Sequence, residues 1–272
     1  MLAVIPWGTD APIYHFPWAT VGLIVATSLV FVITGPADRV DFEPAEVESA
    51  LQLQDENAAA QAKAKLAEAD QKGEEAQDED ESQFAVARGL ERWVLVHGNG
   101  LHPLQWITSN FIHANIGHLL GNMLFLWSFG IVVEGKIGWW RFLLVYLSIG
   151  IAECATEQIL TLGSSASVSY GASAIVYSLL AMSLVWAPKN DLSCWVFIWY
   201  FLRFHFNDYE IPIYWFATFY IATEAITIPL SGFAITSSLL HVLGAAWGFA
   251  LGTLMLKADW VDCENWDFRR CD

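Results

Sequence analysis

The stretch from His113 to Glu134, HANIGHLLGNMLFLWSFGIVVE, decides the fold class. Apart from a few polar positions it is a long apolar run, which is the composition of a helix that spans a bilayer. His118 and Asn122 are four residues apart, so they share one face of this helix. Because polar side chains are costly at membrane depth, this pair is a candidate for function.

The rest of the chain has the same membrane-like composition. Of its 272 residues, 55% are hydrophobic and 15% are charged, whereas an ordinary soluble domain contains about 25% charged residues. Further helices are predicted over Pro17–Thr34, 139–160, 171–187, 211–229 and 237–257. The sequence therefore predicts an all-α, polytopic membrane protein with six membrane-spanning helices.

Two segments depart from this pattern. Residues Asp41–Gln83, between the first two predicted helices, are rich in Asp and Glu and lack an apolar stripe, so we expect a solvated, largely unfolded acidic insertion. The segment Cys194–Phe204 is apolar but too short to cross a bilayer, and we expect it at the interface or packed against helices. The predicted division is an N-terminal segment with the first helix, the insertion, a core of five helices and a tail, over residues 1–34, 35–92, 93–257 and 258–272.

The charge distribution excludes one class of partner and predicts an orientation. The net charge is -16 and no cluster of Lys or Arg is present, so nucleic-acid binding is set aside. The short loops at 161–170 and 230–236 contain no Lys or Arg, which predicts that they lie outside and that both termini lie in the cytoplasm. The basic residues then assigned to the inner side are Lys136, Arg141, Lys189, Arg203, Lys257, Arg269 and Arg270.

A serine and a histidine in later helices could perform nucleophilic chemistry. Ser173 begins an apolar helix, where free backbone N–H groups and the helix dipole suit a developing oxyanion. His241 is followed by Gly244 and Gly248, and glycines at this spacing let two helix backbones approach closely. A serine hydroxyl needs a base within about 3 Å, and His241 could be that base if the two helices pack together. His118 and Asn122 could donate to the oxyanion.

No acidic third member follows from the sequence. Glu153, Glu157 and Glu224 are predicted at membrane depth, but nothing links one of them to His241, so a Ser-His dyad is the simpler hypothesis. The four cysteines lack the spacing of a zinc site or a disulfide framework, and neither a metal nor an organic cofactor is implied. Each motif alone is more commonly a packing feature, since serine, histidine and glycine often join membrane helices. Their occurrence together favours chemistry.

These motifs together resemble those of the rhomboid intramembrane serine proteases. Thr108–His113, His118, Asn122–Gly130 and Glu134 resemble the signature of the second span in that family. The family's nucleophile motif is matched by Gly171, Ser173 and Tyr177. Its last-span motif is matched by His241, Gly244 and Gly248. The family usually has glycine after the serine, where this chain has Ala174.

The resemblance implies a six-helix bundle with a division of roles among these residues. Ser173 would be the nucleophile, His241 the general base, and His118 and Asn122 the oxyanion donors. The resemblance assigns supporting roles to His113, Gly171, Tyr177, Gly244 and Gly248.

The function implied by the resemblance is that of an endopeptidase that cleaves transmembrane protein substrates within the lipid bilayer, in a bacterial inner membrane. The alternative is a catalytically inactive protein that uses the rhomboid fold to bind membrane clients. A transporter is disfavoured, because no pair of broken helices with inverted-repeat symmetry is apparent.

Overall fold

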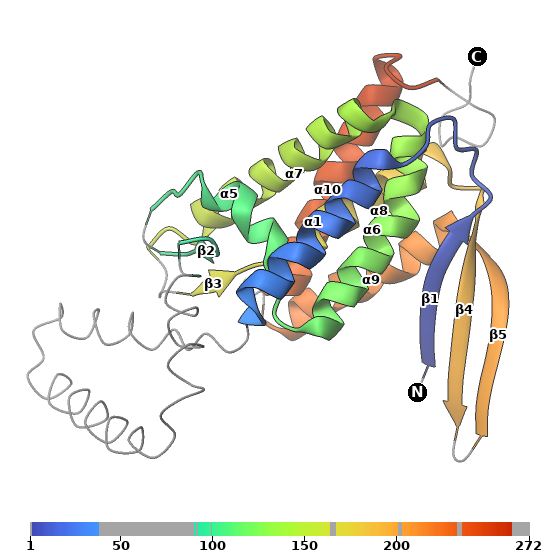
Figure 1. Cartoon of the computed structure of the whole chain (residues 1–272), viewed down its shortest axis with the longest axis horizontal. Coiled ribbons are helices and arrows are strands. Elements are labelled where there is room, and N and C mark those ends of the chain that lie inside the picture. The colour runs from blue at the N-terminus through green and yellow to red at the C-terminus, as the bar shows by residue number, and fades with distance from the viewer. Residues whose placement is uncertain are drawn as a thin grey trace, which may run out of the picture.

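The computed structural model describes residues 2–37, 90, 92–98, 100–163, 167–200, 203–232 and 236–262. The predicted acidic insertion over Asp41–Gln83 and most of the predicted tail lie outside these residues. Within them, the chain forms a helical bundle with a small antiparallel sheet at one end and a short strand pair at the other (Figure 1).

Long helices occur at each of the six predicted positions. The helices are α1 Trp18–Thr34, α6 Ile116–Ile137, α7 Trp139–Leu160, α8 Ser173–Trp186, α9 Ile213–Leu230 and α10 Ser237–Lys257. A short helix α5, Gln105–Thr108, and a 3-10 turn η2, Ser109–Phe111, precede α6. Among the described residues, four helices, α6, α7, α9 and α10, are long and apolar enough to cross a membrane, while α1 and α8 are shorter apolar helices.

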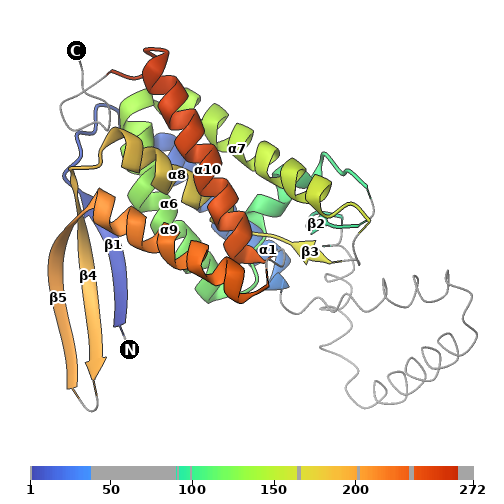
Figure 2. The same ribbon diagram turned by 180° about the vertical axis from the view of Figure 1, so that it is seen from behind.

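Helix α8 lies in the centre of the bundle, and α10 crosses it (Figure 2). The two backbones approach so closely that a Cβ atom added at Gly244 would collide with the carbonyl of Ala174, and one at Gly248 with the carbonyl of Ser178. Hydrogen bonds follow from this proximity: Ser178 Oγ donates to the Gly244 carbonyl at 2.5 Å, and Trp186 Nε1 to the Gly252 carbonyl at 2.9 Å. Glycine is therefore required where α10 passes over the first turns of α8.

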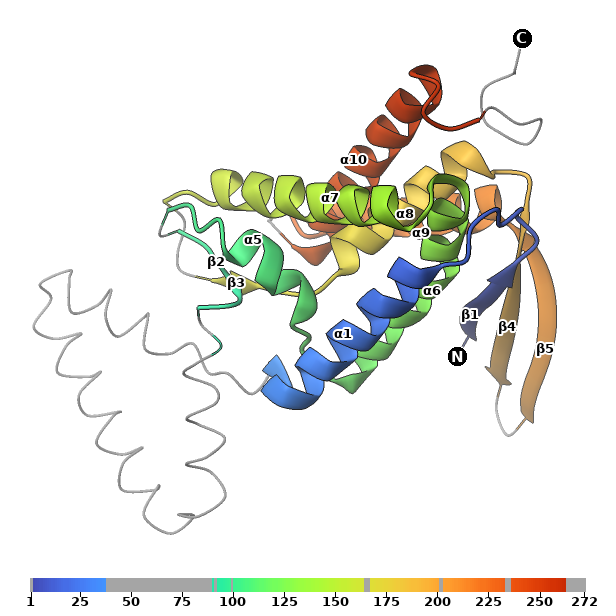
Figure 3. The ribbon, with the colours of Figure 1, turned by 45° about the horizontal axis from the view of Figure 1, so that its top comes forward.

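Helix α1 lies along α6 and is fixed there by a buried carboxylate (Figure 3). Glu134 of α6 is fully buried, and its two oxygens accept from the backbone N–H groups of Ala19 and Thr20 at 2.8 and 2.7 Å. The Thr20 hydroxyl also donates to it, at 2.7 Å. These amides belong to the first turn of α1, where the helix has no acceptors of its own. Glu134 thus caps α1 from a neighbouring helix, a structural role.

The all-α prediction is wrong at the end of the bundle next to α9. Strands β1 Leu2–Thr9, β4 Asp191–Tyr200 and β5 Arg203–Pro212 form an antiparallel sheet in the order β1-β4-β5. The pairing aligns Ile5 with Trp195 and Cys194 with Tyr209. A second sheet at the opposite end pairs β2 Leu95–Val96 with β3 Val168–Ser169.

The segment Cys194–Phe204, expected at the interface or against helices, is therefore part of a β-hairpin. Burial in β4 alternates: Leu192 and Cys194 are fully buried, whereas Trp195 between Cys194 and Val196 is 40% exposed. This period of two is the pattern of a strand with one face on the core. Aromatic and β-branched residues, which favour strands, supply the apolar composition that resembles a short membrane segment.

Candidate active site

A cavity of about 880 Å³ opens among the helices and brings together motifs that are far apart in the sequence. Its walls come from α6, α7, α8 and α10, with contributions from α9 and from the segment that leads into α8. Of the residues with predicted roles, the cavity is lined by His118, Asn122, Gly171, Ser173, Tyr177 and His241. Gly244 and Gly248 lie outside it, at the contact between α8 and α10.

Ser173 is the first residue of α8, and no side chain caps this helix N-terminus. The backbone N–H groups of a first helical turn have no partners within the helix, so they can bind an anion. The chain enters α8 through Gly171, whose φ of +115° is a conformation that side chains disfavour. A Cβ atom there would also lie 2.8 Å from His118 Cε1. Gly171 therefore allows the α8 N-terminus to approach His118.

His118 presents a donor toward this N-terminus. Its Nδ1 accepts a hydrogen bond from the Ala114 backbone N–H at 3.4 Å, so the proton of the neutral ring is on Nε2. Nε2 is 3.1 Å from the position that a Cβ atom of Gly171 would take. The Asn115 side chain caps α6 by accepting from the His118 backbone N–H at 3.0 Å, which fixes the start of the helix.

Asn122 presents a second donor in the same wall. Its side chain is 7% exposed, and its Nδ2 has no hydrogen-bond partner among the described residues. Nδ2 is 3.7 Å from the Cβ position at Gly171, so it faces the same space as His118 Nε2. A buried donor without a partner costs about 1–3 kcal/mol. An oxygen atom bound in the cavity would remove that cost.

His113 lies behind His118 rather than in the cavity wall. It is fully buried, its Nδ1 donates to the Phe111 carbonyl at 3.3 Å, and its ring centroid is 5.1 Å from that of His118. Burial and the neighbouring His118 lower the pKa of His113 to about 4. The ring is therefore neutral at physiological pH, and its position supports His118 by packing.

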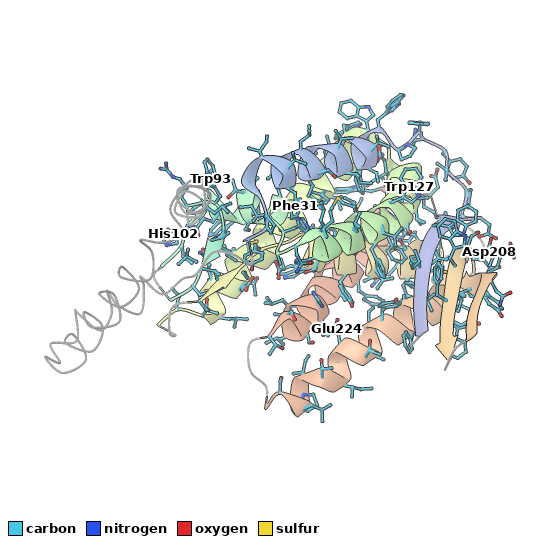
Figure 4. All side chains as sticks on the ribbon, turned by 60° about the horizontal axis from the view of Figure 1, so that its bottom comes forward. Phe31, Trp93, His102, Trp127, Asp208 and Glu224 are labelled. Atoms are coloured by element: carbon cyan, nitrogen blue, oxygen red, sulfur yellow. The ribbon has the colours of Figure 1, made fainter. Side chains whose placement is uncertain are left out.

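His241 on α10 is held from two sides. Its ring stacks on Tyr177 of α8 with centroids 4.4 Å apart and an interplanar angle of 9°. Its Nδ1 lies 2.9 Å from Oε1 of Glu224 on α9, and the Tyr177 hydroxyl donates to the same oxygen at 2.9 Å. Figure 4 shows Glu224 where α9 faces α10. No hydrogen bond joins Ser173 to His241 among those of the described residues, although both line the cavity. Catalytic contacts of this kind often shorten only when substrate binds.

Sequence reasoning left Glu224 without a partner, although a signal was present. Glu224 lies near the end of α9 and His241 near the start of α10, each within two turns of the loop that connects these helices. Successive antiparallel helices place such residues at similar depth. The sequence therefore indicated that Glu224 and His241 lie at similar depth, but not that their side chains face each other.

A second polar group lies toward the β2–β3 end of the cavity. His97 Nε2 is 3.1 Å from Glu157 Oε1, and His97 Nδ1 is 3.0 Å from the Thr161 hydroxyl. Glu153, one turn earlier on α7, also lines the cavity. Both glutamates were predicted from the sequence to lie at membrane depth, but no role was predicted for either. Across the described ranges, no group of three or more His, Cys, Asp or Glu side chains is arranged to hold a metal ion.

The apolar helices and the polar cavity define an integral, multi-pass membrane protein with a polar site among its helices. The chain belongs to the rhomboid family, because the family described as "Rhomboid domain" matches residues 101–258, more than half of the chain. The matched region contains the helices from α5 to α10 and the β4–β5 hairpin.

Individual relatives match shorter stretches. The chain is 34% identical to Rhomboid-like protein 11, chloroplastic, of Arabidopsis thaliana over 38% of its length, and 39% identical to Rhomboid protease GluP of Bacillus subtilis over 31%. It is 44% identical to Rhomboid-type serine protease 2 of Emericella nidulans over 18% of its length. These matches cover 35%, 16% and 10% of the respective relatives, so the chain aligns with about a third or less of each.

Proposed function

We propose that this protein is an intramembrane serine endopeptidase in which Ser173 is the nucleophile and His241 the general base. The observation that carries the proposal is the shared cavity. Ser173 and His241 line it together with the donors of His118 and Asn122, although the four residues come from three helices. Two of the relatives carry protease in their names, which supports the same class of activity.

The mechanism follows from the chemistry of these groups. His241 Nε2 takes the proton of the Ser173 hydroxyl as its oxygen attacks the carbonyl carbon of the scissile peptide bond. The resulting oxyanion accepts from His118 Nε2–H, Asn122 Nδ2–H and the backbone N–H of Ser173. His241 then gives the proton to the leaving amine, and the acyl-enzyme forms. Water, deprotonated by His241, attacks the ester, and its hydrolysis restores the Ser173 hydroxyl.

The proposed setting is a bilayer crossed by six helices, with both termini in the cytoplasm of a bacterium and transmembrane proteins as substrates. The apolar helices support a multi-pass protein. The loops at 161–170 and 230–236, which contain no Lys or Arg, support the orientation. The division into a first helix, an acidic insertion, a core and a tail remains part of this proposal.

The competing function is that of an inactive rhomboid-fold protein that binds membrane clients. The observation that favours it is the lack of a Ser173–His241 hydrogen bond among the described residues. Under this alternative, the serine would be no more reactive than any other membrane serine, so the two functions predict opposite results with a serine-directed reagent.

A fluorophosphonate probe separates the two, because it labels only an activated serine. We expect the purified protein to be labelled, and Ser173→Ala and His241→Ala to abolish the labelling. Ser148→Ala is the matched control, since Ser148 lies on the exposed face of α7, away from the cavity. A correctly folded protein that resists the probe, or one whose labelling survives Ser173→Ala, would reject the proposed protease.

A further inference from the structure

Glu224 makes two polar contacts that link α9 to its neighbours α10 and α8. Its Oε1 is 2.9 Å from His241 Nδ1 and 2.9 Å from the Tyr177 hydroxyl. The Glu224 and His241 side chains are 20% and 15% exposed, so water competes with the bond between them only partly.

From these contacts we infer that Glu224 is a positioning residue for His241, which rests on the proposed function and adds a third member to the Ser173–His241 pair. An ionised carboxylate only accepts hydrogen bonds, so its partner Nδ1 must carry the proton. The lone pair of His241 is then on Nε2, the nitrogen that must act as base toward Ser173. The same carboxylate stabilises the imidazolium that forms after proton transfer.

Tyr177 strengthens this arrangement from the opposite side. Its ring fixes the plane of the His241 ring by stacking, and its hydroxyl fixes the Glu224 oxygen that His241 contacts. The three side chains come from α8, α9 and α10. A base held by both a ring face and a carboxylate has little freedom to rotate, which is what efficient proton transfer requires.

A merely structural role for Glu224 would predict different measurements. As a clamp between helices, it would affect stability and substrate binding, and its loss would not change the tautomer of His241. As a positioning residue, it controls which nitrogen carries the proton, and its loss reduces kcat with little change in KM. The decisive readouts are therefore the His241 tautomer, measured without substrate, and the division of the effect between kcat and KM.

The tautomer is measured by ¹⁵N NMR of histidine-labelled protein in detergent micelles, with the His241 signals assigned by their loss in His241→Ala. We expect the Nδ1–H form in the wild-type protein and a mixture or the Nε2–H form in Glu224→Ala. Glu210→Gln, which alters an exposed glutamate of β5, should leave the signals unchanged. An Nδ1–H form that persists in Glu224→Ala would overturn the inference, whether or not the protein is a protease.

The kinetic test compares Glu224→Ala, which leaves space where the carboxylate was, with Glu224→Gln, whose amide fills that space. A buried orienting carboxylate is worth about 10⁴-fold in kcat in a serine protease, and we expect about 10²-fold for the partly exposed Glu224 in Glu224→Ala. Added formate should partly restore kcat in Glu224→Ala, where it can occupy the vacated site, and not in Glu224→Gln, where the amide fills it. Full activity in both variants, or equal effects of formate on both, would contradict the positioning role.

The acidic end of the cavity carries a second, independent inference. Glu153 is 5% exposed, and its Oε1 has no hydrogen-bond partner among the described residues. Glu157, 4% exposed, is paired with His97. Among the described residues that line the cavity, none is Lys or Arg. The walls therefore present two carboxyl groups with one basic partner, and a buried oxygen without a donor.

We propose that this end of the cavity binds a lysine or arginine side chain of the substrate, close to the scissile bond; this inference too rests on the proposed function. A buried carboxylate oxygen that lacks a hydrogen-bond donor is costly, and an ammonium or guanidinium group supplies both a donor and a compensating charge. Because the same cavity contains Ser173, a peptide at the nucleophile could place a side chain against Glu153.

Binding to the inert Ser173→Ala protein tests this inference without cleavage. Single-span peptides carry one lysine at successive juxtamembrane positions, and matched peptides carry methionine there. At one position we expect lysine to bind about 10-fold more tightly than methionine, which corresponds to about 1.4 kcal/mol. Glu153→Gln should remove this preference and leave the methionine peptide unaffected, while Glu210→Gln should change neither.

Two outcomes would overturn the acidic subsite. The first is equal affinity for lysine and methionine peptides at every position. The second is a lysine preference that survives both Glu153→Gln and Glu157→Gln. If Glu153→Gln does not fold, Glu157→Gln alone provides this test. Because the binding protein lacks its nucleophile, these results do not depend on whether the wild-type protein is a protease.

Discussion

Helix α10 contacts α8 and α9 in two different ways, and the two contacts determine different features of the candidate site. Against α8 the contact is backbone to backbone, with Gly244 and Gly248 over the carbonyls of Ala174 and Ser178. Helix α9 buries few residues, Ile213, Phe216 and Ala217, and meets α10 through the Glu224–His241 bond. The backbone contact therefore sets the distance between the helices that carry Ser173 and His241, whereas the Glu224–His241 bond orients the His241 ring.

The largest expected effect concerns the two groups that this packing brings together. Ser173→Ala and His241→Ala should each abolish cleavage, and the double variant should be no worse than either, because the two act as one unit. In a serine protease such losses reach about 10⁶-fold in kcat. Cleavage assays with thermal unfolding as the control for folding check this. Substantial turnover by either single variant would contradict the Ser-His chemistry.

The contact between α8 and α10 is tested next, by adding side-chain atoms where backbones touch. Gly248→Val should destabilise the protein by about 3 kcal/mol and reduce labelling of Ser173, because the added carbons overlap the Ser178 carbonyl and push the helices apart. Gly22→Ala on α1 is the matched control, since a Cβ atom there has nothing within 4 Å. Normal stability and normal labelling in Gly248→Val would show that the distance is set elsewhere.

The positions of the long helices could be predicted because apolar runs identify membrane helices without knowledge of their neighbours. The prediction of helices over 139–160 and 237–257 agrees with α7 and α10 to the residue. The sheet could not be predicted in this way. Strand β4 pairs with β1, and the paired residues Ile5 and Trp195 are far apart in the sequence. In addition, an apolar composition alone does not distinguish a strand from a short membrane segment.

The candidate site likewise has features that the sequence predicts and features that only the folded structure reveals. The residue types at the cavity were predictable, because serine, histidine and asparagine stand out in apolar helices. The contact of His241 with Glu224 depends on which face of α9 turns toward α10, and helix faces are set by packing that a weakly amphipathic membrane helix does not reveal. Asn122 Nδ2 illustrates the remaining difficulty, because the lack of a partner is a property of the folded structure and cannot be seen in sequence.

Asn122 belongs to neither contact of α10, so its variant separates catalysis from helix packing. Asn122→Ala should lower kcat by about 10²-fold, the usual cost of removing one oxyanion donor, and leave stability unchanged or improved, because it removes an unpaired buried group. Labelling of Ser173 should survive in part, since the base is intact. A kcat equal to that of the wild-type protein would assign Asn122 to packing.

The smallest expected effect comes from Tyr177, which belongs to both contacts of α10. Tyr177→Phe keeps the ring that stacks on His241 and removes the hydroxyl that donates to Glu224. One such hydrogen bond is worth about 1 kcal/mol, so kcat should fall about fivefold, with KM unchanged, as the Glu224 carboxylate gains freedom to turn. Tyr177→Leu, which also removes the stacked ring, should reduce kcat further.

In a Glu224→Ala background the Tyr177 hydroxyl has lost its acceptor, so Tyr177→Phe should have no additional effect on kcat. An equal loss from Tyr177→Phe in both backgrounds would mean that the hydroxyl acts elsewhere, and that the orientation of the base does not depend on the oxygen that these two side chains share.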